Sequence, residues 1–194
     1  GINQVQVNHD IKFDFSRALR TIVRQDPDIV MVGEIRDQET AEIAIKAALT
    51  GHLVFSTLHT NDTASTFARL VDIGVKPYLV ATGVRSILAQ RLVRTICTSC
   101  KELYTPDEIE VRRLGFPVDL DAIELHHGAG CHNCNETGYV GRLGAYELLV
   151  TNDEIRFMLM QGDSTAAIKR TARVYGMASM RDDAWRKALN GITT

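Results

Sequence analysis

The sequence predicts an α/β fold with parallel strands, a small four-cysteine subdomain and a set of C-terminal helices. Short apolar runs alternate with amphipathic helical segments in the first half, and the cysteines fall into two C-x-x-C pairs. The 194 residues, 45% of them hydrophobic, suffice for a packed core. We therefore expect three parts: residues 1–96 as the α/β part, 97–134 as the cysteine subdomain, and 135–194 as a return strand with helices.

The α/β part is expected to open with a helix over residues 14–24, because its apolar side chains recur at helical spacing behind Asp14, a suitable N-cap. The β-branched run Ile29–Val32 is typical of a parallel strand that is buried on both faces. The elements expected next are a helix from Asp37 to about Leu49, a strand at Leu53–Leu58 and a helix from Asn61–Asp62 to Gly74. This strand–helix–strand order predicts a right-handed crossover between two parallel strands.

Elements of the later segments are less uniform. The pattern of Pro77–Arg94 predicts a helix that is interrupted near Gly83. Residues 97–134 change character, and Pro106–Leu114 within them has the pattern of a small helix. The glycine-rich residues 135–150 predict turns that lead into a short strand. Residues 151–189 predict further helices with breaks at Gly162 and Gly176.

Charge and hydropathy exclude several classes of function. The formal net charge is −2 and neither half of the chain has a basic excess, so we expect no nucleic-acid partner. The sequence has one local basic cluster, which comprises Arg85, Arg91, Arg94 and Lys101. This cluster fits a solvated helix face as well as a binding site. Apolar runs are far shorter than the roughly 20 residues of a membrane-spanning helix, so no direct membrane insertion is expected. Gly1 in place of an initiator methionine predicts a truncated chain.

Two titratable side chains directly follow the two predicted strands. Glu34 follows Ile29–Val32 through Gly33, and His59 follows Leu53–Leu58. Ligands of open parallel sheets bind outside the carboxyl ends of the strands, so both side chains are expected at one crevice. An apolar strand that ends in an acid is the layout of a Walker B motif, whose carboxylate serves Mg²⁺ or the attacking water. Solvated loop residues are the alternative interpretation of both positions.

Two C-x-x-C pairs predict a structural zinc site, and their members are Cys97, Cys100, Cys131 and Cys134. Four reduced thiols in a subdomain that folds without metal are the alternative. A redox role is disfavoured, because neither pair stands at the head of a βαβ unit. Three nearby histidines are expected at the surface rather than as ligands: His126, His127 and His132.

Four longer strings resemble a known family; they are Arg24–Asp37, Thr50–Asn61, Ala89–Cys100 and Gly130–Arg142. The first resembles the Walker B region, and the second the histidine box, of the type II secretion ATPases (general secretory pathway protein E) and the related type IV pilus assembly ATPases. The other two strings, each with a C-x-x-C pair, are similar to the same family. All four come in the family's order over nearly the whole chain.

The resemblance implies the C-terminal part of a RecA-like P-loop ATPase domain in a hexameric motor. Such a motor hydrolyses ATP with Mg²⁺ and drives assembly of a pilus or a pseudopilus. It acts at the cytoplasmic face of the inner membrane. Its implied partners are further copies of itself and the cytoplasmic domain of an inner-membrane platform protein. The implied location is therefore cytoplasmic and peripheral to the membrane.

The resemblance also implies roles for single residues. Glu34 would be the Walker B acid that positions or activates water and helps to hold Mg²⁺, and His59 would contact or sense the γ-phosphate. His52 is expected in a supporting role, because it lies at the start of its strand, away from the strand-end crevice. Three further positions match the nucleotide-binding motif: Gly33, Arg36 and Asp37. Arg36 and Asp37 would also suit a purely structural role at the corner between strand and helix.

The phosphate-binding motif G-x-x-x-x-G-K-[ST] is absent, because no glycine of this chain is followed by lysine. We therefore expect that the 194-residue chain alone neither hydrolyses ATP nor binds it tightly. The competing hypothesis is a zinc-containing binding or regulatory module on an inactive ATPase-like scaffold. The motif upstream of Gly1 in the parent gene would favour the motor.

Overall fold

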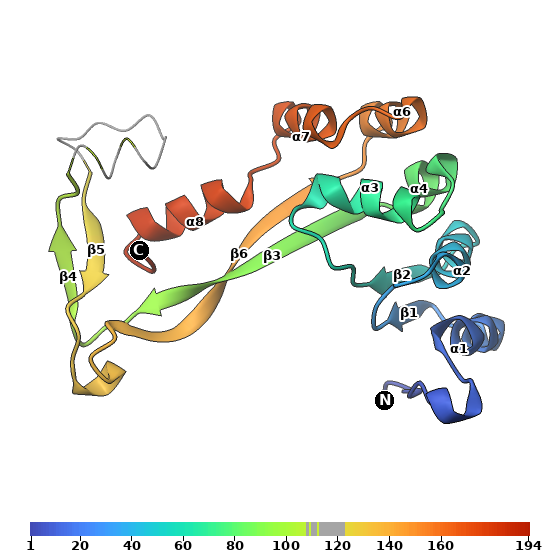
Figure 1. Cartoon of the computed structure of the whole chain (residues 1–194), viewed down its shortest axis with the longest axis horizontal. Helices are drawn as coiled ribbons and strands as arrows, with labels where there is room; N and C mark the ends of the chain where they lie inside the picture. Colours follow the sequence, from blue (N-terminus) through green and yellow to red (C-terminus); the bar gives the residue numbers. More distant parts are fainter. Residues whose placement is uncertain (108, 110–111, 113–122) are drawn as a thin grey trace. The chain divides into compact units, whose positions relative to one another are not determined.

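The computed structural model describes residues 1–107, 109, 112 and 123–194 (Figure 1). By its internal contacts the chain divides into two compact units. Unit 1 comprises Gly1–Leu88 and Leu148–Met177, and unit 2 comprises Ala89–Glu147 and Ala178–Thr194. The three-part division expected from the sequence stays a prediction. The small helix expected at Pro106–Leu114 falls largely outside the described residues.

Unit 1 begins with the expected alternation of helix and strand. Helix α1 (Phe15–Ile22) starts at Asp14, whose carboxylate accepts a hydrogen bond from the Arg17 N–H at 2.9 Å. The elements that follow are strand β1 (Ile29–Val32), helix α2 (Gln38–Leu49) and strand β2 (Leu53–Ser56). The two strands pair in parallel with Ile29 beside Leu53. This pairing confirms the predicted parallel α/β unit.

One face of the β1–β2 sheet is covered and the other is exposed. Val30 and Val32 are each 4% exposed and pack with Leu19 of α1 and Ala44 of α2. The opposite face carries four large exposed side chains: Ile29, Met31, Leu53 and Phe55. The expectation that β1 is buried on both faces is therefore wrong here, because α1 and α2 cover a single face and no described residue covers the other.

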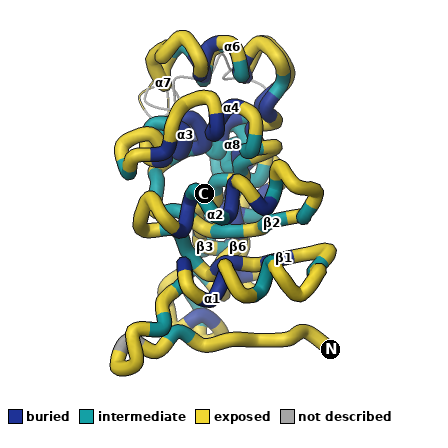
Figure 2. Tube along the Cα trace, turned by 90° about the vertical axis from the view of Figure 1, so that its right-hand side faces the viewer, coloured by how far each residue is buried: buried dark blue, intermediate teal, exposed yellow. Residues whose placement is uncertain are grey.

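The main core of unit 1 involves helices far apart in the sequence. They are α3 (Thr63–Asp72), α4 (Pro77–Gly83), α6 (Asp153–Gln161) and α7 (Thr165–Val174). Phe67, Ile155 and Ile168 are at most 2% exposed and belong to one apolar cluster. Figure 2 shows buried stretches of α3 and α4 among otherwise exposed turns. As the sequence predicts, α6 and α7 end near Gly162 and Gly176, which both have positive φ.

The helix expected over Pro77–Arg94 ends at Gly83. Val84 is extended, and strand β3 (Ser86–Ile96) replaces the second half of the predicted helix. The segment carries several β-branched residues, which favour strands. Over its first five positions, exposed and half-buried residues also alternate with the period of a strand.

Strand β6 (Tyr139–Val150) is also longer than expected, since 12 residues replace the predicted turns and short strand. It pairs with β3. The Thr151 N–H donates to the Arg85 carbonyl at one end and the Cys97 N–H donates to the Gly138 carbonyl at the other, so the strands run antiparallel (Figure 1). The division between the two units falls within both strands. A strand whose partner lies far along the chain gives a weak local signal, which explains both errors.

Unit 2 contains a second strand pair and the last helix. The antiparallel pair is formed by β4 (Lys101–Tyr104) and β5 (Leu125–Gly128). Helix α8 (Met180–Leu189) begins at the N-cap Ser179. Its Asp183 accepts a hydrogen bond from the Tyr146 N–H of β6 at 2.8 Å. Among the described residues, no helix has the length and apolar character needed to cross a bilayer.

Candidate functional site

Glu34 and His59 meet beyond the carboxyl ends of β1 and β2. The Oε2 atom of Glu34 lies 3.3 Å from the Nε2 atom of His59. The Glu34 side chain is 21% exposed, whereas the His59 ring is 87% exposed. The structure thus brings together the two side chains that the sequence places after successive strands.

Hydrogen bonds between the strand ends hold this arrangement. The Ile35 N–H donates to the Thr57 carbonyl at 3.1 Å, and the Thr57 hydroxyl donates to the Gly33 carbonyl at 2.7 Å. These bonds continue the parallel pairing past the last residues of β1 and β2. Glu34 and His59 therefore lie two and three residues beyond the ends of paired neighbouring strands.

Arg36 favours the charged form of Glu34. Its Nη2 atom lies 2.6 Å from Oε1 of Glu34, and this hydrogen bond lowers the pKa of Glu34 below its ordinary value. The His59 ring has a smaller effect in the same direction. Both interactions favour the ionised carboxylate. Such a group accepts hydrogen bonds from water and binds cations, but it is a weak base.

Asp37 and His52 have structural partners of their own. The Asp37 carboxylate caps α2 by accepting a hydrogen bond from the Thr40 N–H at 2.8 Å. The Nδ1 atom of His52 lies 3.0 Å from the Ala47 carbonyl oxygen. His52 precedes β2 and His59 follows it, so the structure does not bring His52 to Glu34.

Gly33 is not explained by crowding. A Cβ at this position would meet only the ring of Phe15, at an ordinary contact distance of 3.6 Å. Its φ is also outside the left-handed region. Nothing among the described neighbours of Gly33 therefore requires glycine.

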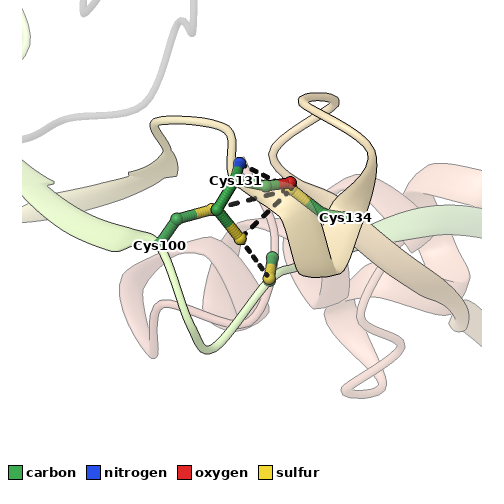
Figure 3. A group of neighbouring side chains, drawn as sticks. Cys100, Cys131 and Cys134 are labelled. Carbon is green, nitrogen blue, oxygen red and sulfur yellow. Dashed lines mark hydrogen bonds between the residues drawn. The ribbon is translucent and has the colours of Figure 1, made fainter.

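Four cysteine sulfur atoms form one compact cluster, those of Cys97, Cys100, Cys131 and Cys134. Figure 3 labels three of these residues, Cys100, Cys131 and Cys134. All four lie within 4.8 Å of one another, and three pairs are 3.7–3.9 Å apart. A tetrahedral zinc site with Zn–S bonds of about 2.3 Å requires S···S distances of about 3.8 Å. These separations are far longer than a disulfide bond, and all four cysteines are free. The cluster therefore fits a zinc ion.

Backbone donors prepare one of these thiols for metal binding. The N–H groups of Cys131 and Gly138 lie 3.1 and 3.2 Å from the Cys134 sulfur. Burial raises the pKa of Cys134, but these donors outweigh burial and lower the pKa to about 6. The thiolate is the metal-binding form of cysteine. Burial instead raises the pKa of Cys100 to about 12, so a metal would have to displace its proton.

The described histidines do not join the sulfur cluster. His126 and His127 belong to β5, and His132 begins a short 3₁₀ helix (His132–Cys134). Within the described residues, the metal-binding group consists of the cysteines alone.

The sequence motifs did not indicate Thr57 or Lys169, which bond to the Gly33 carbonyl and to Asp62. Thr57 links the two strand ends, as described above. The Nζ atom of Lys169 in α7 lies 2.9 Å from Oδ2 of Asp62, at the start of α3. Lysine inside an amphipathic helix carries no motif, and a contact between positions 107 residues apart leaves no local signal.

Comparison with known proteins agrees with the motifs. The family model described as type II/IV secretion system protein matches residues 1–194. The chain belongs to this family. Its membership confirms the resemblance of the four sequence strings.

Two relatives in the type II/IV secretion system protein family show how much of a longer protein the chain represents. The chain is 52% identical over 195 residues to the type II secretion system protein E of Pseudomonas aeruginosa. It is 51% identical over 195 residues to the type IV pilus assembly ATPase PilB of Thermus thermophilus. Both alignments cover 100% of the chain. They cover only 38% of the Pseudomonas aeruginosa protein and 22% of the Thermus thermophilus protein. The chain thus spans well under half of their length.

A solved structure supports the family fold. The crystal structure of the pilus retraction motor PilT with bound ADP matches with a TM-score of 0.66 and 30% identity. The match covers 99% of this chain and 44% of that chain. It confirms the expected α/β ATPase fold for this family member.

Proposed function

We propose that this chain carries the Walker B and histidine-box part of the ATP site of a motor. The motor drives assembly of a type II secretion pseudopilus or a type IV pilus. The observation that carries the proposal is the meeting of Glu34 and His59 beyond two parallel strands. Support comes from a relative that is named as a pilus assembly ATPase and from a PilT structure that holds ADP.

Each polar residue of this site has a role in the proposal. Glu34 accepts a hydrogen bond from the attacking water and would help to hold Mg²⁺. The Arg36 guanidinium favours the ionised form of Glu34, which is the form that accepts a hydrogen bond from water. His59 projects from the sheet and donates a hydrogen bond to a terminal phosphate oxygen. When bound, Mg²⁺ supplies charge neutralisation at the phosphates.

Three neighbouring residues support the site without reacting. Gly33 joins β1 to Glu34, and its carbonyl accepts a hydrogen bond from the Thr57 hydroxyl. Asp37 fixes the start of α2, and His52 fixes the turn into β2. Together they hold the strand–helix corners from which the reacting groups project.

The chain itself supplies part of the ATP site, because it contains no G-x-x-x-x-G-K-[ST] motif. Residues 1–96 form the second half of the ATPase core in this proposal, 97–134 the zinc subdomain and 135–194 the return strand and helices. The isolated chain neither hydrolyses ATP nor binds it tightly. The full-length protein forms a homo-hexamer in the cytoplasm and docks on the cytoplasmic domain of an inner-membrane platform protein.

For the four cysteines we propose a structural zinc site. The all-sulfur donor set and the S···S spacing of 3.7–3.9 Å suit Zn²⁺. Zinc binding would tie residues that lie 34 positions apart in the chain and so stabilise unit 2. This ion takes no part in the chemistry of ATP.

The test of the motor is ATP turnover by the full-length gene product with Mg²⁺. We expect a loss of about 100-fold or more for Glu34→Gln, the scale of a lost catalytic group, and about tenfold for His59→Ala. Glu42→Gln is a matched control, because Glu42 pairs with Lys46 on α2 and has no part in the site. Equal turnover by Glu34→Gln and wild type contradicts the assignment of Glu34.

A further inference from the structure

A partly buried ion pair lies beside the loop that carries His59. The Nζ atom of Lys169 in α7 is 2.9 Å from Oδ2 of Asp62. The two side chains are 33% and 28% exposed, so water screens the pair less than it screens a surface pair. The pair joins a C-terminal helix to the segment between β2 and α3.

Asp62 fixes where α3 begins. Its Oδ1 atom accepts a hydrogen bond from the Ser65 N–H at 2.9 Å, and the Asp62 N–H returns one to the Ser65 hydroxyl at 3.3 Å. This reciprocal capping box uses one carboxylate oxygen of Asp62. The other oxygen receives Lys169, so helix capping and the ion pair act on the same group.

The loop between His59 and Asp62 has little freedom. Leu58 packs against the main core of unit 1, and the Thr60 hydroxyl lies 2.8 Å from the Thr66 hydroxyl of α3. Only two residues separate His59 from Asp62. A displacement of Asp62 therefore reaches the backbone of His59, while the His59 ring itself extends into solvent.

Helix α7 is held on α3 independently of the ion pair. Ile168 and Ala172 are 2% and 3% exposed and pack in the same apolar cluster as Phe67 of α3. The Thr63 hydroxyl, at the start of α3, also donates to the sulfur of Met177 at 3.6 Å. Removal of the Lys169 charge should therefore leave the helices packed and release the carboxylate of Asp62.

We propose that Lys169 is a positioning residue for His59. Through Asp62 it sets the loop that presents the histidine to the nucleotide, and this inference rests on the proposed function of His59. A movement of α7 shifts Asp62 and with it His59. Helix α7 thereby influences ATP turnover through this ion pair.

The experiment measures kcat, KM for ATP and Tm of the full-length gene product. Lys169→Met should lower kcat about five- to tenfold, a usual size for coupling between sites, with little change in Tm. Asp62→Asn keeps an oxygen for the Ser65 N–H and should show the same loss. Lys169→Arg should recover most of the activity. Lys187→Met is the matched control, because Lys187 pairs with Asp183 in unit 2, and it should keep wild-type kcat.

A double variant separates positioning from general stability. In a His59→Ala background, Lys169→Met should cause no further loss of kcat, because the group that it positions is gone. Losses that multiply in the double variant, or wild-type kcat in Lys169→Met, overturn the inference. If Lys169→Met does not fold, Asp62→Asn carries the same comparison.

Amide hydrogen exchange distinguishes this inference from the proposed function. The peptide that spans residues 57–66 should exchange faster in Lys169→Met than in the wild type. If His59→Ala turns over ATP like the wild type, the proposed role of His59 fails, and the positioning role fails with it. Amide hydrogen exchange then tests only whether Lys169 holds the loop of residues 57–66. Unchanged exchange of this peptide in Lys169→Met overturns that structural link too.

Discussion

The backbones of Gly128 and Gly138 pass so close together that neither residue has room for a side chain. A Cβ added to either glycine would overlap the carbonyl oxygen of the other. Gly138 also has a φ of 78°, which L side chains rarely adopt. Its carbonyl accepts a hydrogen bond from the Cys97 N–H at 2.9 Å, and its N–H donates to the Cys134 sulfur at 3.2 Å. Gly138, at this close crossing with Gly128, therefore connects one cysteine of each pair.

Replacing Gly128 should damage the zinc site without touching a ligand. We expect Gly128→Ala to lower the free energy of unfolding by about 1–3 kcal/mol through overpacking and to lower the zinc content. Denaturant unfolding and elemental analysis measure the two effects. Gly33→Ala is the control for stability, since a Cβ there meets an ordinary contact. Wild-type stability and zinc content in Gly128→Ala would show that the crossing is unimportant.

Removal of a thiol should abolish metal binding. Protein purified without chelator should contain about one zinc ion per chain, and Cys97→Ser should retain only a small fraction of it. Apparent binding free energies of structural zinc are on the order of 10 kcal/mol, so Cys97→Ser should also unfold more easily. His132→Ala, next to the ligand Cys131, should keep its zinc. A wild-type protein free of zinc would refute the metal site.

Asp183 should make the stability of the protein depend on pH. Burial raises its pKa, but Lys187 and the Tyr146 N–H outweigh burial and hold the pKa of Asp183 below its ordinary value of 3.8. A folded-state pKa below the unfolded one stabilises the fold above the unfolded value, and this stability is lost as the pH falls through the folded value.

The variant Asp183→Asn tests this dependence. It should reduce the free energy of unfolding by about 1 kcal/mol at pH 7, because the partly exposed ion pair with Lys187 and the negative charge opposite the Tyr146 N–H are lost. The difference from the wild type should shrink as the pH falls below about 4. Urea unfolding at pH 7 and below pH 4 measures the difference in free energy of unfolding. Asp153→Asn is the control, because the Asp153 side chain is 96% exposed. An equal difference at both pH values would contradict this role.

Arg36 should control the acid limb of ATP turnover. Its hydrogen bond holds the pKa of Glu34 below the ordinary value of 4.5. Without Arg36 the carboxylate takes up a proton at a higher pH. We expect Arg36→Gln to move the acid limb of kcat to higher pH, and Arg36→Lys to retain most of the wild-type profile. Identical acid limbs in wild type and Arg36→Gln would show that Arg36 does not act on Glu34.

Local signals in the sequence predicted the elements that local chemistry determines. Asp14 and Asp62 cap helices as expected, because short polar side chains satisfy free N–H groups at a helix start. The β1–β2 pair was predicted because a crossover helix separates two apolar runs. The long β3–β6 pair was missed, since its strands depend on partners far along the chain.

The candidate site divides in the same way. The strand ends predicted that Glu34 and His59 would meet, because parallel strands end at one edge of their sheet. The two C-x-x-C pairs predicted their own cluster from spacing alone. The Asp62–Lys169 ion pair was unpredictable, because the packing of α7 on α3 creates it.

Glu34 should matter far more for the hydrolysis of ATP than for its binding. The most direct test measures Mg·ATP binding and turnover side by side for full-length wild type and Glu34→Gln. We expect that Glu34→Gln binds Mg·ATP within about threefold of the wild type and loses turnover by about 100-fold or more. Undiminished turnover in Glu34→Gln, with the wild type active, would contradict it.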